Sequence, residues 1–393
     1  MVIDTLNEEQ RAWQMKARKF AQEVIRPISL ARDHIAEPGG TWDWDIIRKG
    51  SRLGFRTAVV PKEWGGHGID FVTQALVMAE LAKADSAISK AFSQNWKWSH
   101  LIAGACTDEQ KERFLEPFIA DDTYVLGFGG TEPNAGSDNR FPPEDDPRAG
   151  MKLRAERRGE EWILNGEKTF IANGGVGKLY FVGARTNPEV PVGEGTTVFM
   201  LPVGTPGFRI GKVFNKSGWR FYQNAELILE NARVPHANVL GEVNGGSRAR
   251  QRGGVVEFND FELACNALGV CDDACESAMR HAKVQKRGGR LLIEHQSVQL
   301  RISEMQMLTE ALRSFVMRVA QETDRGISRP ANSVLLMNFS GDVIQRVTKS
   351  HLAIHGAPGG VMDAHADKLV RDGIIWTHLA SDATQRLKVM RRL

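Results

Sequence analysis

The chain has 393 residues, of which 42% are hydrophobic and 25% are charged, and its formal net charge is +3. This length predicts two or three domains rather than one core. The small net charge gives no reason to expect nucleic acid or an anionic membrane as a partner, and no apolar run reaches the length of a membrane span. The acidic, polar start lacks the features of a secretory signal, and the four cysteines form no C-x-x-C pair. We therefore expect a protein of the reducing cytoplasm.

The first part of the chain shows helical periodicity and helix caps. Asn7 can cap a helix over residues 4–35, in which apolar residues recur at helical spacing. A glycine-rich turn over residues 60–66 interrupts the helical pattern. Further helices are expected at 42–53, 70–84, 85–105 and 107–120. These patterns predict that residues 1–122 form an all-helical domain.

The pattern then changes to short β-prone runs separated by Gly and Asn turns. Strands are expected at 124–128, 151–158, 161–165, 168–172, 180–185, 197–203, 208–213 and 225–229. Residues 123–236 should therefore form a small β-barrel or sandwich. The polar, Pro-rich run 139–150 inside it is predicted to be an exposed loop.

Long helical patterns return in the last part of the chain. They cover about 245–286, 294–324, 329–356 and 361–391. Long helices with short connections predict an antiparallel four-helix bundle over residues 237–393. The expected fold is a multi-domain α+β protein with a helical domain, a central β domain and a helical bundle.

Residues 124–138, YVLGFGGTEPNAGSD, begin β-prone and become rich in glycine and small hydroxyl side chains. Such a strand end exposes backbone N–H groups that suit a flat, anionic ligand. An ordinary strand and turn capped by Ser137 and Asp138 would look the same. The run TEPNAGSD, however, closely resembles the signature T-E-P-x-A-G-S-D of the acyl-CoA dehydrogenase flavoproteins, which is a specific match.

The resemblance extends from about Leu6 to Arg392, and the predicted order of domains is also that of the family. It is carried by the stretches LNEEQRAWQMKARKFAQEVIRP, VPKEWGGHG, LILENARVPHANVLG, RLLIEHQ and KLVRDG. The chain is identified as a divergent member of this family. The resemblance implies the family fold, an FAD cofactor and the oxidation of an acyl-CoA thioester.

The resemblance also implies the residues that contact the flavin ring. Phe128, Gly130 and Thr131 would follow its pyrimidine edge, and Ser137 would lie near the pyrophosphate and the substrate. The second flavin stretch, usually W-I-T in the family, is made of Phe170, Ile171 and Ala172. Phe170 can still cover the ring face. Ala172 lacks the hydroxyl that normally reaches the flavin N5.

The dinucleotide tail is held by the neighbouring subunit in the family. Where the family usually has an Arg, this chain has Gln285. The contact with the dinucleotide tail is therefore expected to be weaker, or to be made by Lys286 or Arg287 instead. Gln296 matches a family glutamine. The later Q-x-x-G-G element lacks its glutamine, although Gly356 and Ala357 should still let the backbone approach the phosphates.

Dehydrogenation beside a thioester needs a carboxylate at the α-carbon, opposite the flavin N5 that takes the β-hydride. The position of the family glutamate is Asp363, which is shorter by about 1.5 Å. Asp363 is our first choice for the base; it could instead cap the last helix. The other base position of the family is Asn259, and Glu257 and Asp260 are held in reserve.

The helix over residues 93–104 corresponds to the one that lines the acyl pocket in the family. Trp96 and Lys97 on it suggest a short, cyclic, aromatic or anionic acyl group. Alternatively, Trp96 and Trp98 pack between domains and Lys97 is solvated. The full set of expected substrate contacts is Ser137, Trp96, Lys97, Glu257, Asp260 and Gly360.

The resemblance predicts FAD-dependent α,β-dehydrogenation of an acyl-CoA thioester by a homotetramer, with electron-transfer flavoprotein as the electron acceptor. The alternatives are a reductase, a desulfinase or an oxidase of the same fold, or a non-catalytic flavin-binding subunit. The residues His351, His355, Asp363 and His365 could form a metal set, but no H-E-x-x-H motif is present and we expect no metal.

Overall fold

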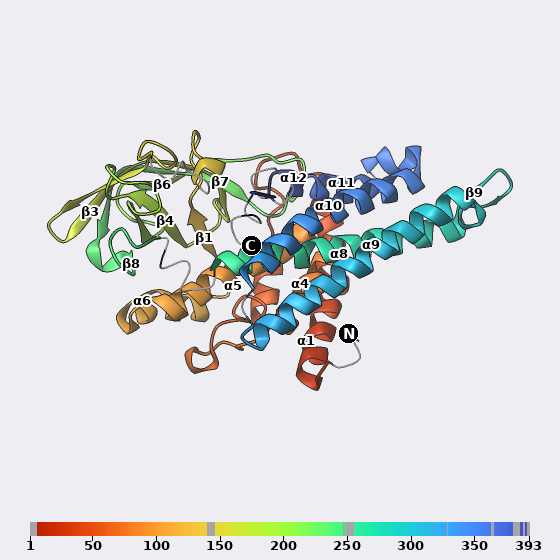
Figure 1. Ribbon diagram of the computed structural model, residues 1–393, viewed down its shortest axis with the longest axis horizontal. Helices are drawn as coiled ribbons and strands as arrows, with labels where there is room; N and C mark the ends of the chain where they lie inside the picture. The colour runs from red at the N-terminus through yellow and green to blue at the C-terminus, as the bar shows by residue number, and fades with distance from the viewer. Residues whose placement is uncertain are drawn as a thin grey trace.

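The computed structural model describes residues 6–139, 146–246, 248, 255–327, 329–362, 365–379, 386–387 and 390. An N-terminal group of helices packs against a long helical bundle, and a β-sheet lies at one end of the molecule (Figure 1). Over these described ranges, no helix combines the length and the apolar character that crossing a membrane would need.

The N-terminal helical stretch is nearly as long as the sequence predicts. Helix α1 (Glu8–Phe20) continues through a π-helical turn, η2 (Ala21–Ile25), into α2 (Arg26–Arg32). A capping box begins it, because the Gln10 N–H donates to Asn7 Oδ1 at 2.8 Å and the Asn7 N–H donates to Gln10 Oε1 at 3.0 Å. The predicted cap at Asn7 is confirmed.

The remaining N-terminal helices also agree with the predicted runs. They are α3 (Trp44–Arg52), α4 (Phe71–Ala84), α5 (Ser86–Ala105) and α6 (Asp108–Ala120). Within the predicted turn over residues 60–66 the structure has one short 3-10 turn, η3 (Lys62–Trp64). The glycine turn before α4 is sterically required at Gly66, where an added Cβ would lie 2.1 Å from the carbonyl oxygen of Val60.

The central part is one sheet of eight strands. Its strands are β1 (Leu126–Gly129), β2 (Arg154–Arg158), β3 (Glu161–Ala172), β4 (Leu179–Arg185), β5 (Thr196–Pro202), β6 (Phe208–Val213), β7 (Asn224–Pro235) and β8 (Val239–Leu240). Their order is β6-β7-β3-β2-β4-β5-β8, with β1 parallel to β4. Short 3-10 turns, η4 (Ser137–Asn139) and η5 (His236–Asn238), lie between strands.

Two strand predictions were wrong in detail. The runs 161–165 and 168–172 form the single strand β3, and β7 extends beyond the predicted 225–229. The reason is pairing: β3 and β7 hydrogen-bond along their length, and irregularities in register absorb the turn-like Gly166. The predicted loop 139–150 lies partly outside the described residues.

The C-terminal part is dominated by three long helices, α8 (Val255–Val284), α9 (Gln296–Asp324) and α10 (Pro330–His355). A hairpin of β9 (Lys286–Arg287) and β10 (Arg290–Leu291), followed by η6 (Leu292–Glu294), joins α8 to α9. After α10 come η7 (Ala357–Gly360), α11 (Ala366–Gly373) and α12 (Trp376–Leu379).

The prediction of one helix over residues 361–391 was wrong in the described part of the chain. Helix α11 ends at Gly373, and α12 begins at Trp376. Each of the two short helices is fixed to another part of the fold: Asp372 Oδ1 accepts the Trp219 N–H at 2.7 Å, and the buried Trp376 indole donates to the Leu263 carbonyl at 3.3 Å.

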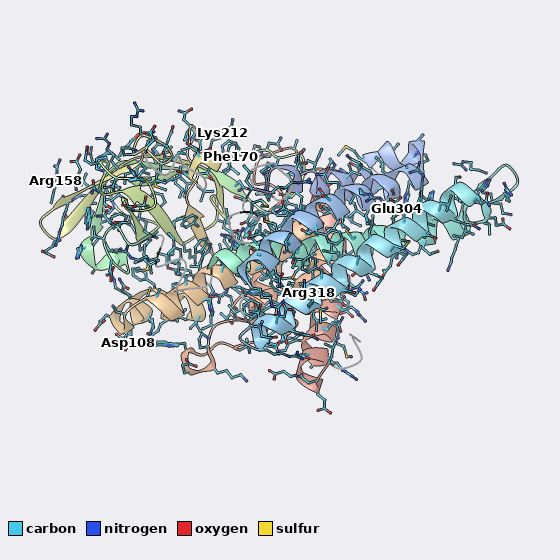
Figure 2. All side chains as sticks on the ribbon, viewed as in Figure 1. Asp108, Arg158, Phe170, Lys212, Glu304 and Arg318 are labelled. Carbon is cyan, nitrogen blue, oxygen red and sulfur yellow. The ribbon has the colours of Figure 1, made fainter. Side chains whose placement is uncertain are left out.

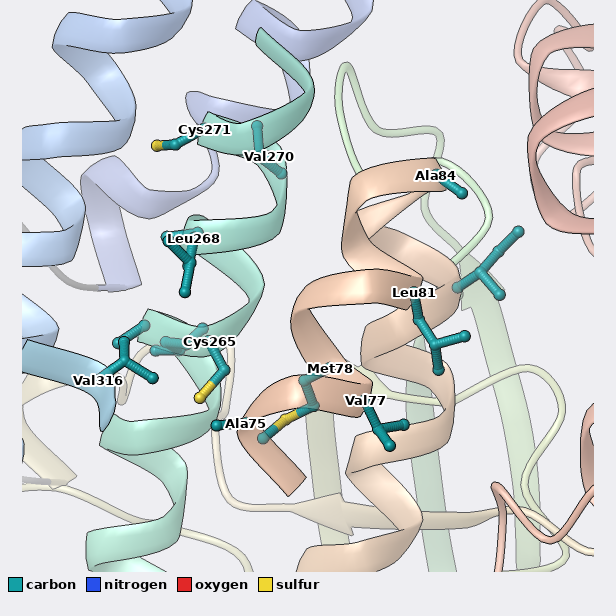
Figure 3. Close-up of a cluster of buried hydrophobic side chains, with 14 of the residues drawn as sticks. Ala75, Val77, Met78, Leu81, Ala84, Cys265, Leu268, Val270, Cys271 and Val316 are labelled. Atoms are coloured by element: carbon teal, nitrogen blue, oxygen red, sulfur yellow. The ribbon is translucent and has the colours of Figure 1, made fainter. Parts of the chain in front are cut away.

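The two helical parts share one hydrophobic core. Figure 3 shows Met78 of α4 and Cys265 of α8 pointing toward each other between the two helices. The crossing of α4 and α8 is close at Gly269, where an added Cβ would lie 2.3 Å from the carbonyl oxygen of Ala79. The four cysteines, Cys106, Cys265, Cys271 and Cys275, are all unbridged and buried, as an apolar role predicts.

Candidate functional site

The ends of β1 and β3 lie side by side. The backbone N–H of Thr169 donates to the carbonyl oxygen of Thr131 at 2.9 Å. The two stretches that the resemblance assigns to the flavin, 128–131 and 170–172, are therefore neighbours in space although they are separated in the sequence. The structure brings together Phe128, Gly130, Thr131, Phe170, Ile171 and Ala172.

Phe170 presents an aromatic face to solvent at this edge. Its side chain is 58% exposed and stacks on Phe214, with ring centroids 4.4 Å apart. Its backbone has φ +56°, a left-handed conformation that a bulky residue adopts only under constraint. Asn224 supplies one such constraint by donating to the Phe170 carbonyl at 2.7 Å. Figure 2 shows Phe170 near Lys212 on the outer edge of the sheet.

A buried ion pair holds the signature against β3, and sequence reasoning missed it. Lys168 Nζ donates to Glu132 Oε1 at 2.7 Å, and both side chains are buried. Glu132 also accepts the backbone N–H groups of Lys152 at 2.6 Å and Leu153 at 3.0 Å. Burial lowers the pKa of Lys168 to about 8, although the Glu132 carboxylate opposes this shift. The pair thus anchors the segment that contains Thr131.

Trp98 joins α5 to the strand end. Its ring stacks on Phe128, with centroids 4.6 Å apart, and also on Phe181 at 5.4 Å. Trp96 is 1% exposed and donates its indole N–H to the Phe55 carbonyl at 2.5 Å within the helical core. Its surroundings are therefore packed protein, which favours the structural alternative over the predicted substrate contact.

Lys97 lies in a buried charged cluster between α5 and α8, so the alternative of a solvated lysine was wrong. Its Nζ is 2.8 Å from Asn259 Oδ1 and 3.1 Å from Glu262 Oε2. Lys90 forms a second ion pair with Glu262, and the Ser93 hydroxyl donates to the same carboxylate. All three charged side chains are buried. We call Lys90, Lys97 and Glu262 the α5–α8 cluster.

The cluster keeps Glu262 ionised. Burial by itself would raise the pKa of Glu262, but Lys90 and Lys97 outweigh burial and lower it. Burial lowers the pKa of Lys90 to about 7. A carboxylate with a lowered pKa is a weak proton acceptor, so Glu262 is a poor base. The sequence signal for this cluster was present, because Lys90 and Lys97 are seven positions apart and share one helix face.

Several predicted site residues fall outside what the structure describes. Asp363 lies outside the described residues, and the side chains of Ser137 and Glu257 are likewise outside them. Asp260, which follows Asn259 directly on α8, is buried. Gly360 is exposed at the end of η7.

The residues expected to hold the dinucleotide tail lie on the bundle. Gln296 starts α9, and Gly356 and Ala357 follow α10; all three are exposed. In Figure 1 the β9–β10 hairpin beside Gln296 is at the opposite end of the molecule from the sheet.

The histidines considered as a metal set do not gather at one point. His351 packs on His355 with ring centroids 4.3 Å apart, and His355 packs on His281 at 4.1 Å. His365 stacks on His34 instead, at 5.7 Å. Across the portion of the chain that is described, no group of three or more His, Cys, Asp or Glu side chains could hold a metal ion.

Buried His351 predicts an acid-dependent loss of stability. Burial lowers the pKa of His351 from 6.5 to about 3, so the unfolded chain takes up the proton first as the pH falls. Stability should fall between pH 6.5 and 3, by up to about 1.4 kcal/mol per pH unit from this one group. In urea unfolding at several pH values, His351→Phe should show a shallower decline than wild type. His34→Gln is the surface control, and equal slopes for wild type and His351→Phe would contradict the assignment.

Comparisons with known proteins agree with this arrangement. The models described as the acyl-CoA dehydrogenase N-terminal, middle and C-terminal domains match residues 7–122, 127–232 and 256–392. The short-chain-specific acyl-CoA dehydrogenase of Megasphaera elsdenii is 30% identical over 375 residues, which cover 94% of each chain.

Solved structures show the same fold. Butyryl-CoA dehydrogenase from Megasphaera elsdenii has a TM-score of 0.90 at 28% identity, covering 100% of this chain and 99% of that one. A chain from a structure of the electron transferring flavoprotein of Acidaminococcus fermentans has a TM-score of 0.90 at 30% identity, with 100% and 99% covered. The predicted fold class is confirmed. The chain belongs to the acyl-CoA dehydrogenase family of oxidoreductases.

Proposed function

We propose that this chain binds FAD and dehydrogenates an acyl-CoA thioester between its α and β carbons. The observation that carries the proposal is the edge where β1 and β3 end together, with the exposed face of Phe170 beside Thr131. A flat aromatic cofactor would cover a ring that is otherwise left to solvent.

The residues present at this edge suit an isoalloxazine ring. Phe170 would cover one face, and Thr131 would donate its hydroxyl to the ring edge. The buried Glu132–Lys168 pair holds the backbone of this segment in place, so the donors need little reorganisation on binding. Bound FAD would supply the acceptor for the β-hydride.

We propose Asp363 as the base that removes the α-proton, so that a carbon–carbon double bond forms as the hydride leaves. Two residues on α8, Asn259 and Glu262, are unsuitable as the base. Asn259 is an amide that donates and accepts hydrogen bonds but is no base near neutral pH, and Glu262 is ion-paired with a lowered pKa. Asp260 and Glu257 remain in reserve.

We also propose the assembly and the electron acceptor. In Figure 1 the β9–β10 hairpin, which precedes η6 and Gln296, lies at the end of the molecule away from the sheet. We therefore propose that a second subunit supplies Gln296 to the dinucleotide, in a homotetramer. Electron-transfer flavoprotein is the proposed acceptor, and a similar chain comes from a structure of such a flavoprotein. We further propose domain boundaries at 1–122, 123–236 and 237–393, and a cytoplasmic location.

The test is the visible spectrum of the purified protein. Flavin absorbance that bleaches anaerobically on adding an acyl-CoA supports a dehydrogenase. A colourless protein that takes up no FAD would contradict the cofactor. A yellow protein that no thioester bleaches would favour a non-catalytic subunit or another reaction on the same fold.

A further inference from the structure

Strands β3 and β6 each carry a bulge opposite the same residue of β7, the strand that lies between them. On β3, Thr169 and Phe170 lie where β7 has only Glu226. On β6, Gly211 and Lys212 lie opposite the same Glu226. A β-bulge bends its strand and changes the direction of its side chains. The bulge on β3 therefore accounts for the exposed ring of Phe170 at the edge proposed for the flavin.

Asn224, the first residue of β7, is hydrogen-bonded to both aromatic residues of this edge. Its side-chain amide donates to the Phe170 carbonyl at 2.7 Å, and its backbone carbonyl accepts the Phe214 N–H at 2.9 Å. The two rings are stacked, with 24° between their planes. Because Phe214 covers one face of the Phe170 ring, the surface that Phe170 exposes is its other face and its edge.

Lys216 fixes the orientation of the Asn224 amide. The Phe170 carbonyl can only accept a hydrogen bond, so it must face the NH₂ group of this amide. The amide oxygen is then left for Lys216 Nζ, which donates to it at 2.6 Å and to the Tyr222 carbonyl at 2.5 Å. The Asn224 side chain therefore cannot turn over without losing the hydrogen bonds at both of its ends.

The backbone of Phe170 needs such a restraint, because its φ of +56° lies in the left-handed region. This conformation is unfavourable for a residue with a Cβ, and its cost is comparable to the net contribution of one hydrogen bond. The bond from Asn224 is therefore strong enough to decide which backbone conformation Phe170 adopts. Without that bond, a right-handed or extended backbone would be favoured, and the ring would point in another direction.

We propose that Asn224 and Lys216 are positioning residues for the flavin, and that they hold the Phe170 ring against Phe214 as a preformed aromatic wall. This inference rests on the proposed binding of FAD and names residues outside the signature that prepare the chain for it. A wall that is already formed lowers the ordering cost of binding a flat ring. The stack with Phe214 makes Phe214 part of the cofactor site, although its ring supports Phe170 from behind.

The experiment measures how tightly the purified holoprotein keeps its flavin. On dilution, the fluorescence of released FAD gives the dissociation constant. Asn224→Ala should raise this constant about tenfold, the factor that corresponds to the net contribution of one hydrogen bond. Asn224→Asp keeps an acceptor for Lys216 but has no N–H for the Phe170 carbonyl, so it should weaken FAD binding at least as much. Lys216→Met and Phe214→Leu should each raise the constant by a smaller factor.

The matched control is Asn165→Ala, because Asn165 Oδ1 accepts the Asn231 N–H at 2.8 Å and so joins the same two strands farther along. It should change neither the dissociation constant nor the visible circular dichroism of the bound flavin, which reports how the ring lies against its neighbours. Asn224→Ala should change both.

Urea unfolding measures the stability of each variant separately from flavin binding. A folded Asn224→Ala that is less stable but binds FAD with the wild-type constant and spectrum would overturn the positioning role, and so would wild-type binding by Asn224→Asp. If Asn224→Ala does not fold, Lys216→Met and Phe214→Leu decide the question by the same comparison. A wild-type protein that holds no flavin would instead overturn the proposed function itself.

Discussion

Replacing Asp363 with Asn is expected to leave the protein yellow and to slow its bleaching by acyl-CoA by about 10²- to 10⁴-fold, the usual contribution of a general base. The amide has nearly the same shape as the carboxylate but cannot accept the α-proton. Flavin binding should survive, because the proposed ring contacts are on β1 and β3 rather than in this segment. Stopped-flow absorbance under anaerobic conditions measures the rate.

The matched control is Asp342→Asn, which removes a surface carboxylate that pairs with Arg386 on the bundle. It should bleach at the wild-type rate. Wild-type bleaching by Asp363→Asn as well would place the base elsewhere, and Asp260→Asn and Glu257→Gln would then be compared in the same assay. Glu262 is left out of this comparison because Lys90 and Lys97 hold its carboxylate in two buried ion pairs.

Lys168→Met is expected to lower the free energy of unfolding by about 3–5 kcal/mol, the cost of leaving one partner of a buried ion pair without the other. The Glu132 carboxylate would stay buried beside two backbone N–H groups with no cation. Flavin content should fall too, because the pair holds the segment that contains Thr131 against β3. Equilibrium unfolding in urea and the ratio of flavin to protein absorbance measure the two effects.

Two further variants test whether the loss of stability comes from breaking the buried pair or simply from removing a lysine. Lys178→Met removes a half-exposed partner of Asp121 and should cost at most about 1 kcal/mol. Lys168→Met combined with Glu132→Gln should recover part of the stability, because the amide keeps an acceptor for the backbone N–H groups without a buried charge. If Lys168→Met were as mild as Lys178→Met, the buried pair would not be what holds the signature in place.

Local features of the fold were predictable because their causes are local. The caps at Asn7 and Thr107 depend on residues three positions away, and the structure shows a capping box at both. The break at Gly54 depends on the φ of +88° that this residue adopts. Where a boundary depends on a partner, prediction failed: β3 is one strand because β7 pairs along it, and the helix expected over 361–391 breaks where Asp372 binds the Trp219 N–H.

The candidate site was predictable in part. The signature placed Phe128, Gly130 and Thr131 on one strand end, and the structure adds that Phe170 lies beside them, exposed and constrained. The role of Glu132 within the same signature was not visible, because its partner lies on another strand. Asp363 was chosen from its position relative to a glycine turn and stays a prediction.

The sequence by itself determined the order of helical, β and helical parts, because this order depends on periodicity, and the run TEPNAGSD carried the resemblance to the family. That residues 128–131 and 170–172 lie together was expected only from that resemblance, because the two stretches are far apart in the chain. Only the tertiary structure decided which charges are buried together. Lys90 and Lys97 share a helix face that the sequence shows, but their carboxylate comes from α8, far along the chain. Ion pairs between residues so far apart in the chain leave no periodic pattern in the sequence. These pairs form only when α5 and α8 pack together and bury all three charged groups away from water.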